Sequence, residues 1–203
     1  AEPSRIVFAG VGKTDAEIRD ALGAGIGFFN VESEAEMDNL ASIAESMGRR
    51  APAALRVNPD VDPKTHVYTT TGKRETKFGV DLERARRVFH DFGRRRGLDL
   101  CAIHLHIGSP VNTIEPYVQS ITKGLGLIDQ LRREGFTLRA INIGGGYGAN
   151  YEDHQAPSAL DYAAQVVPLL KGADLTVMLE PGRMITANAG ILLTRTLYTK
   201  QSG

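Results

Sequence analysis

The stretch Leu100-Cys101-Ala102-Ile103-His104-Leu105-His106-Ile107-Gly108-Ser109 decides the fold expected for this chain. Its apolar and polar residues alternate, and in a β-strand successive side chains point to opposite faces. The apolar side chains at odd positions from Cys101 to Ile107 share one face, and His104 and His106 share the other. The apolar face predicts helices packed outside the strand. The other face predicts a polar interior, with His106 nearer the carboxyl end.

Strand–helix units repeat on both sides of this stretch. Short apolar runs rich in β-branched residues alternate with amphipathic helical runs along the chain. Because such repeats predict parallel strands joined by right-handed crossovers, we expect an α/β protein. The expected strands are 6–9, 26–31, 53–58, 100–107, 139–143, 176–179 and 191–198.

Helix boundaries are visible at several places. Residues 14–17 and 33–36 each carry a hydroxyl first and a glutamate three positions later, which is the pattern of a capping box. Gly23 and Gly48 follow apolar turns, where a left-handed residue commonly ends a helix. Apolar stripes at helical spacing predict the inner faces of three further helices: Leu82, Ala85, Val88, Phe89 and Phe92; Val118, Ile121, Leu125, Ile128 and Leu131; and Leu160, Ala163, Val167 and Leu170.

The positions of polar residues separate two folds that fit these repeats, the open doubly wound sheet and the (β/α)8 barrel. Polar groups fall at the carboxyl ends of different strands, at 56–58, His106, 144–146 and 180–183. A barrel gathers those ends at one mouth, whereas an open sheet favours a single crevice. We therefore predict a partial (β/α)8 TIM barrel with six or seven of its eight strands, in one domain spanning residues 1–203.

The composition excludes several classes of function. The 203 residues carry 24 Lys and Arg against 24 Asp and Glu, so a net charge of zero gives no basic surface for nucleic acid. No apolar run approaches the ~20 residues that cross a membrane, and no signal peptide opens the chain. Cys101 is the single cysteine, which favours a reducing, cytoplasmic location. Because an expected strand begins soon after Ala1, we expect the chain to be part of a longer protein.

Three interpretations fit the His104-x-His106 pair. The two side chains could be satisfied polar residues of a barrel interior, they could contact an organic cofactor, or they could bind zinc, for which His-x-His is a familiar arrangement. Against zinc, the histidines at 66, 90 and 154 do not fall at strand ends that would complete a ligand set.

Two further motifs follow later strands. Gly144-Gly145-Gly146 could turn backbone N–H groups toward a phosphate, or could be a flexible strand-to-helix turn. It is not the G-x-G-x-x-G pattern of a dinucleotide site. In Glu180-Pro181-Gly182-Arg183 the carboxylate and the guanidinium could pair across the turn. If the mouth holds a cofactor with a ring nitrogen and a phosphate, the carboxylate would keep that nitrogen protonated and the turn would bind the anion.

Together these motifs resemble the alanine-racemase-like decarboxylases that depend on pyridoxal phosphate (PLP). The resemblance rests on residues 104–109, 143–146 and 180–183, in this order and spacing, and it covers essentially all of the chain. Within the family the pattern is most similar to the diaminopimelate decarboxylases. Supporting stretches are 8–14, 29–33, 55–59 and the run 70–79, which resembles the longer connection of that subgroup.

The resemblance implies a role for each residue at the mouth. His106 would stack on the pyridine ring, Ser109 would bind the phosphate, and Glu180 would pair with the ring nitrogen. Arg183 would also lie near a substrate carboxylate. The remaining implied residues are Gly144, Gly145 and Gly146 at the phosphate, Pro181, Gly182 and Arg183 in the cofactor loop, and Arg56 and Lys77 as supports of His106 and Glu180.

The reaction implied by the resemblance is decarboxylation of meso-2,6-diaminopimelate to L-lysine, the last step of lysine biosynthesis, in a full-length homodimer. The family's cofactor-binding lysine is expected upstream of Ala1, and Lys13, Lys73 and Lys77 are poor substitutes because they sit in other motifs. The family's acid cysteine belongs to a C-terminal β-domain expected beyond Gly203. We therefore expect this chain alone to be inactive.

Three other functions are compatible with parts of the pattern. A related decarboxylase acting on ornithine, arginine or carboxynorspermidine would share the barrel motifs, and only the run 70–79 argues against it. A PLP-binding barrel protein without turnover would not need the intact set of His106, Ser109, Glu180 and Arg183. A zinc hydrolase would use His104 and His106 as ligands.

Overall fold

The computed structural model describes residues 1–62, 78–151 and 156–201. In this part of the chain one parallel sheet has the strand order β1-β2-β3-β5-β6-β7, with β4 beside the end of β3. The strands are β1 (Val7–Phe8), β2 (Phe28–Val31), β3 (Ala51–Asn58), β4 (Val80–Asp81), β5 (Leu98–Leu105), β6 (Ala140–Asn142) and β7 (Thr176–Met178).

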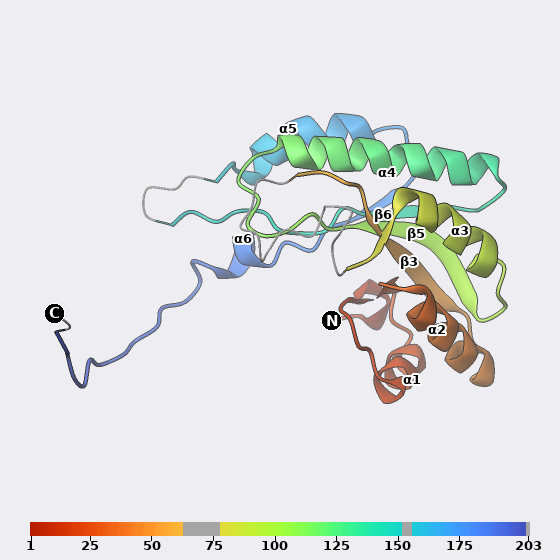
Figure 1. Ribbon diagram of the computed structural model, residues 1–203, viewed down its shortest axis with the longest axis horizontal. Helices are drawn as coiled ribbons and strands as arrows, with labels where there is room; N and C mark the ends of the chain where they lie inside the picture. The colour runs from red at the N-terminus through yellow and green to blue at the C-terminus, as the bar shows by residue number, and fades with distance from the viewer. Residues whose placement is uncertain (63–77, 152–155, 202–203) are drawn as a thin grey trace.

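Helices connect the strands and cover one side of the sheet (Figure 1). They are α1 (Asp15–Ala24), α2 (Glu34–Ser46), α3 (Leu82–Phe92), α4 (Glu115–Arg133), α5 (Ala159–Leu170) and α6 (Arg183–Thr186), with a 3-10 turn at Pro3–Arg5. The sheet curls around its uncovered side, so its strands form part of a barrel wall. The predicted partial (β/α)8 barrel is confirmed.

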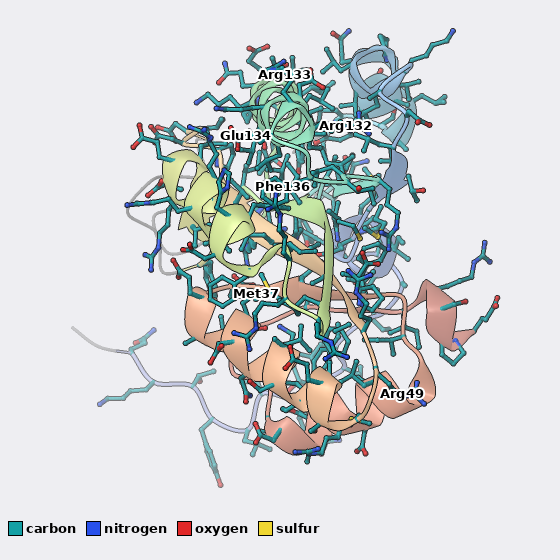
Figure 2. The ribbon with its side chains drawn as sticks, turned by 90° about the vertical axis from the view of Figure 1, so that its right-hand side faces the viewer. Met37, Arg49, Arg132, Arg133, Glu134 and Phe136 are labelled. Carbon is teal, nitrogen blue, oxygen red and sulfur yellow. The ribbon has the colours of Figure 1, made fainter. Side chains whose placement is uncertain are left out.

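The main core lies between the sheet and the helices. Ile103 and Leu105 of β5 are buried there with Phe89 of α3, and the Phe136 ring meets the Phe89 ring edge-on at 5.7 Å between centroids. Figure 2 shows Phe136 beneath the end of α4, with Met37 of α2 further along the same layer. Full burial of one such side chain stabilises the fold by about 1.5–3 kcal/mol.

The inner face of the sheet carries a different set of side chains. Ala54, Ala102 and Ala140 form a small apolar cluster on β3, β5 and β6. Two residues further along, Arg56, His104 and Asn142 occupy neighbouring positions of the same three strands. Because side chains alternate along a strand, the inner face changes from alanine to polar groups toward the carboxyl ends. The alternation predicted for β5 is confirmed.

The helix boundaries agree only in part with the sequence patterns. Thr14 caps α1 with both bonds of a capping box, and Gly48 has a left-handed φ of 63°. The expected end at Gly23 is wrong, because α1 continues to Ala24 and Gly25, whose φ is 72°, caps it. Ser33 caps α2, but the Glu36 carboxylate does not close the box. It accepts the backbone N–H of Glu32 instead.

The inner faces expected for α3 and α4 are confirmed, whereas the face expected for α5 is wrong. Leu160 is 82% exposed and Val167 is 55% exposed, while Tyr162 and Val166 are buried. The Tyr162 hydroxyl donates to the carbonyl of Val111 at 2.9 Å. Its ring also meets the ring of Tyr117 edge-on. A polar tip that needs a partner therefore sets which side of α5 faces inward, and apolar spacing alone did not reveal it.

The strand expected at 191–198 is also wrong. This segment extends away from the sheet (Figure 1), and Ile191, Leu192 and Leu193 are each more than 90% exposed. A strand needs a hydrogen-bonded neighbour, and no strand in the described part of the chain pairs with these residues. In contrast, β4 has two residues and was too short to show a period in the sequence.

Helices long and apolar enough to span a membrane do not occur among the described residues.

The contrast between β5 and α5 gives a stability prediction. Ile103→Ala removes side-chain volume from a site that is 0% exposed, and we expect it to lower the free energy of unfolding by about 2–5 kcal/mol. Leu160→Ala is the control, because it truncates an exposed side chain and should change that free energy by less than about 0.5 kcal/mol. Urea unfolding of the 203-residue protein measures both. A larger loss for Leu160→Ala would restore the original assignment of the α5 face.

Candidate functional site

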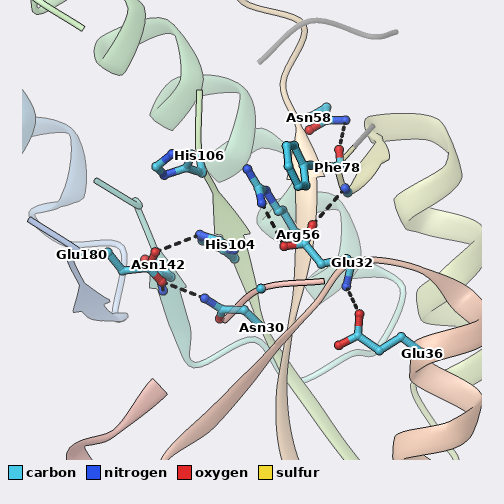
Figure 3. Close-up of polar contacts among 12 residues, drawn as sticks. Asn30, Glu32, Glu36, Arg56, Asn58, Phe78, His104, His106, Asn142 and Glu180 are labelled. Carbon is cyan, nitrogen blue, oxygen red and sulfur yellow. Dashed lines mark hydrogen bonds and ion pairs between the residues drawn. The ribbon is translucent and has the colours of Figure 1, made fainter. Parts of the chain in front are cut away.

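Polar side chains from several strands surround the carboxylate of Glu180 at the carboxyl end of the sheet (Figure 3). Asn30 of β2 and Asn142 of β6 each donate a side-chain amide to its Oε1 at 2.7 Å. The backbone N–H of Glu180 donates to the carbonyl of Gly144 at 2.9 Å, which fixes the turn that follows β7. Segments far apart in the sequence are therefore brought together around one carboxylate.

His104 faces the second oxygen of this carboxylate. Its Nε2 lies 3.6 Å from Oε2 of Glu180, which is an electrostatic contact rather than a normal hydrogen bond. Burial alone would raise the pKa of Glu180, but the facing imidazole of His104, the amide of Asn142 and the charge of His106 together lower it to about 2. Glu180 is therefore an anion throughout the neutral pH range.

His106 lies just beyond the end of β5, and its ring is held by the backbone. The N–H of Gly145 donates to Nδ1 at 3.3 Å, which places the proton of the neutral ring on Nε2. Burial lowers the pKa of His106 to about 4, with the charge of Arg56 and the neighbouring imidazole of His104 acting in the same direction and Glu180 opposing them. The ring is therefore neutral at pH 7.

The three glycines after β6 are buried at this point of the sheet. A Cβ at Gly144, Gly145 or Gly146 would collide with a carbonyl oxygen of Leu105, Glu180 or Gly108, respectively. The φ angles of 70° at Gly144 and 87° at Gly146 are left-handed as well. Glycine is required here because backbone segments approach each other without room for side chains.

The glycine turn is held from both sides. Tyr117 donates its hydroxyl to the carbonyl of Gly145 at 3.0 Å, and the N–H of Gly144 donates to Oδ1 of Asn142 at 2.9 Å. These two hydrogen bonds tie the turn to α4 and to the end of β6.

Arg183 and Ser109 form a second polar group beside the glycine turn. The Arg183 Nε donates to the Ser109 hydroxyl at 3.2 Å, and its Nη1 donates to the Tyr151 hydroxyl at the same distance. Arg183 is exposed and makes no ion pair with Glu180 among the described residues. The ion pair across the turn, one alternative for this motif, is therefore wrong. The guanidinium remains accessible to an anion.

Arg56 and Lys77 were expected to support His106 and Glu180. The Arg56 Nη1 donates to Glu32 Oε1 at 2.8 Å, and its guanidinium lies 4.8 Å from the centre of the Phe78 ring. Its influence on His106 is through charge. Lys77 lies outside the described residues.

Lys13 stands at the β1 side of the same rim. Its ammonium donates to the carbonyls of Gly10 at 2.6 Å and Asn30 at 2.8 Å, and to the carboxylate of Glu36 at 2.6 Å. The side chain is 2% exposed. These contacts occupy all three N–H bonds of the ammonium group.

His104, His106 and Glu180 come together at one rim. Nitrogen and oxygen atoms of His104, His106 and Glu180 lie within 4.8 Å of one another, a grouping whose ligand types could also hold a metal ion. Geometry alone therefore leaves both the metal and the organic cofactor open.

Comparison with known proteins separates these two possibilities. The family described as "Pyridoxal-dependent decarboxylase, pyridoxal binding domain" matches residues 1–187. The chain belongs to this family.

Individual members of the pyridoxal-dependent decarboxylases are similar over nearly the whole chain. Diaminopimelate decarboxylases of Pseudomonas aeruginosa and Aquifex aeolicus are each 43% identical over 99% of this chain and 48% of their own length. A crystal structure of the Helicobacter pylori diaminopimelate decarboxylase complexed with L-lysine has a TM-score of 0.88 at 40% identity, covering 93% of this chain and 48% of that one. The chain thus spans about half the length of the relatives it matches.

The donor set of this family member fits pyridoxal phosphate. Glu180 is ionised, and both amides that bind it use Oε1, so Oε2 is not occupied by an amide. Such a carboxylate suits a protonated ring nitrogen. The neutral ring of His106 offers a flat face, and Ser109 with Arg183 offers donors for a phosphate. His104 also has two buried ring nitrogens without a described hydrogen-bond partner.

Sequence patterns did not single out several members of this arrangement. Alternation could have placed the Asn142 side chain on the inner face, because Asn142 lies two residues before Gly144, but no sequence pattern pairs Asn30 or Asn142 with Glu180. Contacts between neighbouring strands, such as that between Glu32 after β2 and Arg56 of β3, have no local signal. Tyr117 and Tyr151 reach the site from α4 and a loop, which spacing could not show.

The low pKa of His106 predicts a pH dependence of stability without cofactor. Between the ordinary pKa of 6.5 and the folded value of about 4, the unfolded chain binds more protons, so stability falls as the pH is lowered through this window. From pH 7 to pH 4.5 the loss through His106 should be on the order of 2 kcal/mol. Urea unfolding at both pH values should show a smaller loss for His106→Gln than for the unsubstituted protein. Equal losses would contradict the assigned cause.

Proposed function

We propose that the full-length protein that contains these residues decarboxylates meso-2,6-diaminopimelate to L-lysine and CO2, with pyridoxal phosphate as its cofactor. The observation that carries this proposal is the ionised Glu180, held by Asn30, Asn142 and His104 at the rim that also presents His106 and Arg183. Membership of the pyridoxal-dependent decarboxylases and similarity to proteins named diaminopimelate decarboxylase support it.

Each side chain at the rim would have a separate task in binding the cofactor. His106 would lie against the face of the ring, since its neutral imidazole is held by the N–H of Gly145. Ser109 and Arg183 would donate to the phosphate. The other proposed cofactor contacts are Gly144, Gly145 and Gly146, where the backbone is free of side chains, and Pro181 and Gly182 in the turn before α6.

Glu180 would stabilise the protonated ring nitrogen of the cofactor by its negative charge. Pyridoxal phosphate, when bound, supplies a ring that accepts the electron pair left on the substrate carbon as CO2 departs. A ring nitrogen accepts electrons best when it is protonated, and a neighbouring anion favours that protonated form. Glu180 stays anionic because its pKa is near 2, and the amides of Asn30 and Asn142 hold its orientation.

Arg183 is the residue we propose for substrate recognition in this part of the protein. Its guanidinium is exposed and bonded to two hydroxyl groups, those of Ser109 and Tyr151, rather than to a carboxylate. It can therefore bind a carboxylate of an amino-acid substrate in addition to its contact with the phosphate site.

We also propose that the chain forms most of the cofactor-binding barrel domain of a longer, cytoplasmic, homodimeric enzyme. Arg56 and Lys77 would support His106 and Glu180 from outside the cofactor contacts. The 48% share of the relatives that this chain covers leads us to assign turnover to the full-length protein rather than to these 203 residues.

A substrate panel tests the proposed reaction. The full-length protein, loaded with pyridoxal phosphate, should release CO2 from meso-2,6-diaminopimelate and should act at least about tenfold less well, by kcat/KM, on L-ornithine, L-arginine and L-lysine. Preference for ornithine or arginine would assign a sister decarboxylase instead. Cofactor binding without CO2 release from any of these amino acids would assign a binding protein.

The role of Glu180 has its own test. Glu180→Gln removes the anion but retains similar size, and we expect kcat to fall on the order of 100-fold because electrostatic stabilisation is lost. Glu134→Gln is the matched control, since Glu134 pairs with Arg86 and His90 on the outer helices and should leave kcat unchanged. Steady-state CO2 release measures both. Equal kcat for the two variants would remove Glu180 from the mechanism.

A further inference from the structure

We propose that His104 is a positioning residue that holds the charge and orientation of Glu180, and that it does so by donating from Nε2 to the carboxylate. The inference deepens the proposed function and rests on it. The residues proposed to contact the cofactor do not include His104.

His104 is a buried polar side chain, so its position needs a reason other than packing. The residue is 2% exposed, and neither ring nitrogen has a hydrogen-bond partner among the described residues. An unsatisfied buried polar group costs about 1–3 kcal/mol, so an imidazole is an unfavourable way to fill space. Ala102, two residues earlier on the same inner face, shows that this wall accepts apolar side chains. Packing alone therefore does not account for an imidazole at this position.

The geometry around Glu180 assigns His104 to one oxygen. Asn30 and Asn142 both donate to Oε1, and neither donates to Oε2. The Nε2 of His104 lies 3.6 Å from Oε2, and Figure 3 shows the imidazole facing the carboxylate. A contraction of a few tenths of an ångström would make this contact a normal hydrogen bond. His104 is therefore the side chain that faces Oε2, the oxygen to which neither amide donates.

Charged and polar groups from several strands surround His104. Arg56 on β3 and His106 beyond β5 face it with positive or potentially positive groups, while Glu180 beyond β7 faces it with a negative one. Asn30 from β2 and Asn142 from β6 are uncharged. Glu32 neutralises Arg56 at 2.8 Å. The Nε2 of His104 therefore faces the negative group of this set, the carboxylate of Glu180.

Two substitutions of similar length separate donation from packing. His104→Gln keeps an N–H donor within reach of Oε2, whereas His104→Met fills similar volume without a donor. His90→Gln is the matched control, because His90 also contacts a glutamate, Glu134 at 2.8 Å, but does so on the outer surface. All four proteins are prepared full-length and loaded with pyridoxal phosphate whose ring nitrogen carries ¹⁵N.

The ¹⁵N chemical shift reports whether the ring nitrogen is protonated, which a purely structural role would not change. At pH 7.5 we expect the unsubstituted, His104→Gln and His90→Gln proteins to show the protonated shift, and His104→Met to move toward the unprotonated one. For His104→Met, kcat should fall about tenfold with KM changed less than about twofold, since the lost interaction acts mainly in the transition state. His104→Gln should recover most of that loss.

Three results would overturn the inference. The ¹⁵N shift and kcat of His104→Met could equal those of the unsubstituted protein, or His104→Gln and His104→Met could lose both properties equally. Failure of both variants to fold, seen by circular dichroism while His90→Gln folds, would make His104 a structural residue. If instead the unsubstituted full-length protein binds no pyridoxal phosphate, the proposed function itself fails, and that outcome is distinct from the other three.

Discussion

The whole site depends on placing one ionised carboxylate, that of Glu180, in a partly buried position. Burial disfavours the charged form of Glu180, so hydrogen bonds and favourable charges from the rest of the fold must offset this cost. Those groups come from β2, β5 and β6, through Asn30, His104 and Asn142. Because a small shift of any of these strands would leave the charge uncompensated, the curvature of the sheet and the state of the carboxylate are linked.

The close approach of these strand ends also explains the glycines after β6 and the small side chains on the inner face of the sheet. Gly144 and Gly145 allow the chain after β6 to pass directly against the ends of β5 and β7, where any Cβ would strike a carbonyl. Below them, Ala54, Ala102 and Ala140 keep the lower wall apolar and small. Polar chemistry is thereby confined to the carboxyl ends of the strands, as expected for parallel barrels.

The sequence was most informative where one local rule acts alone. Alternation placed His104 and His106 on the inner face, and the ordered motifs identified the rim. The sequence pattern was misleading where a tertiary contact competes with it. At Tyr162 the hydroxyl contact sets which face of α5 points inward. At 191–198 the apolar run predicts a strand, but no described strand pairs with it. The partners of Glu180 were missed because amide contacts between distant strands have no signature along the chain.

The bonding of Lys13 has a consequence for amine chemistry at the rim. A primary amine attacks an aldehyde through its lone pair, which exists only after the ammonium group gives up a proton. In Lys13 each N–H is held by an oxygen, from the carbonyls of Gly10 and Asn30 and from the Glu36 carboxylate. This amine is therefore a tether between the first two strand–helix units, and carbonyl reagents should find it inert.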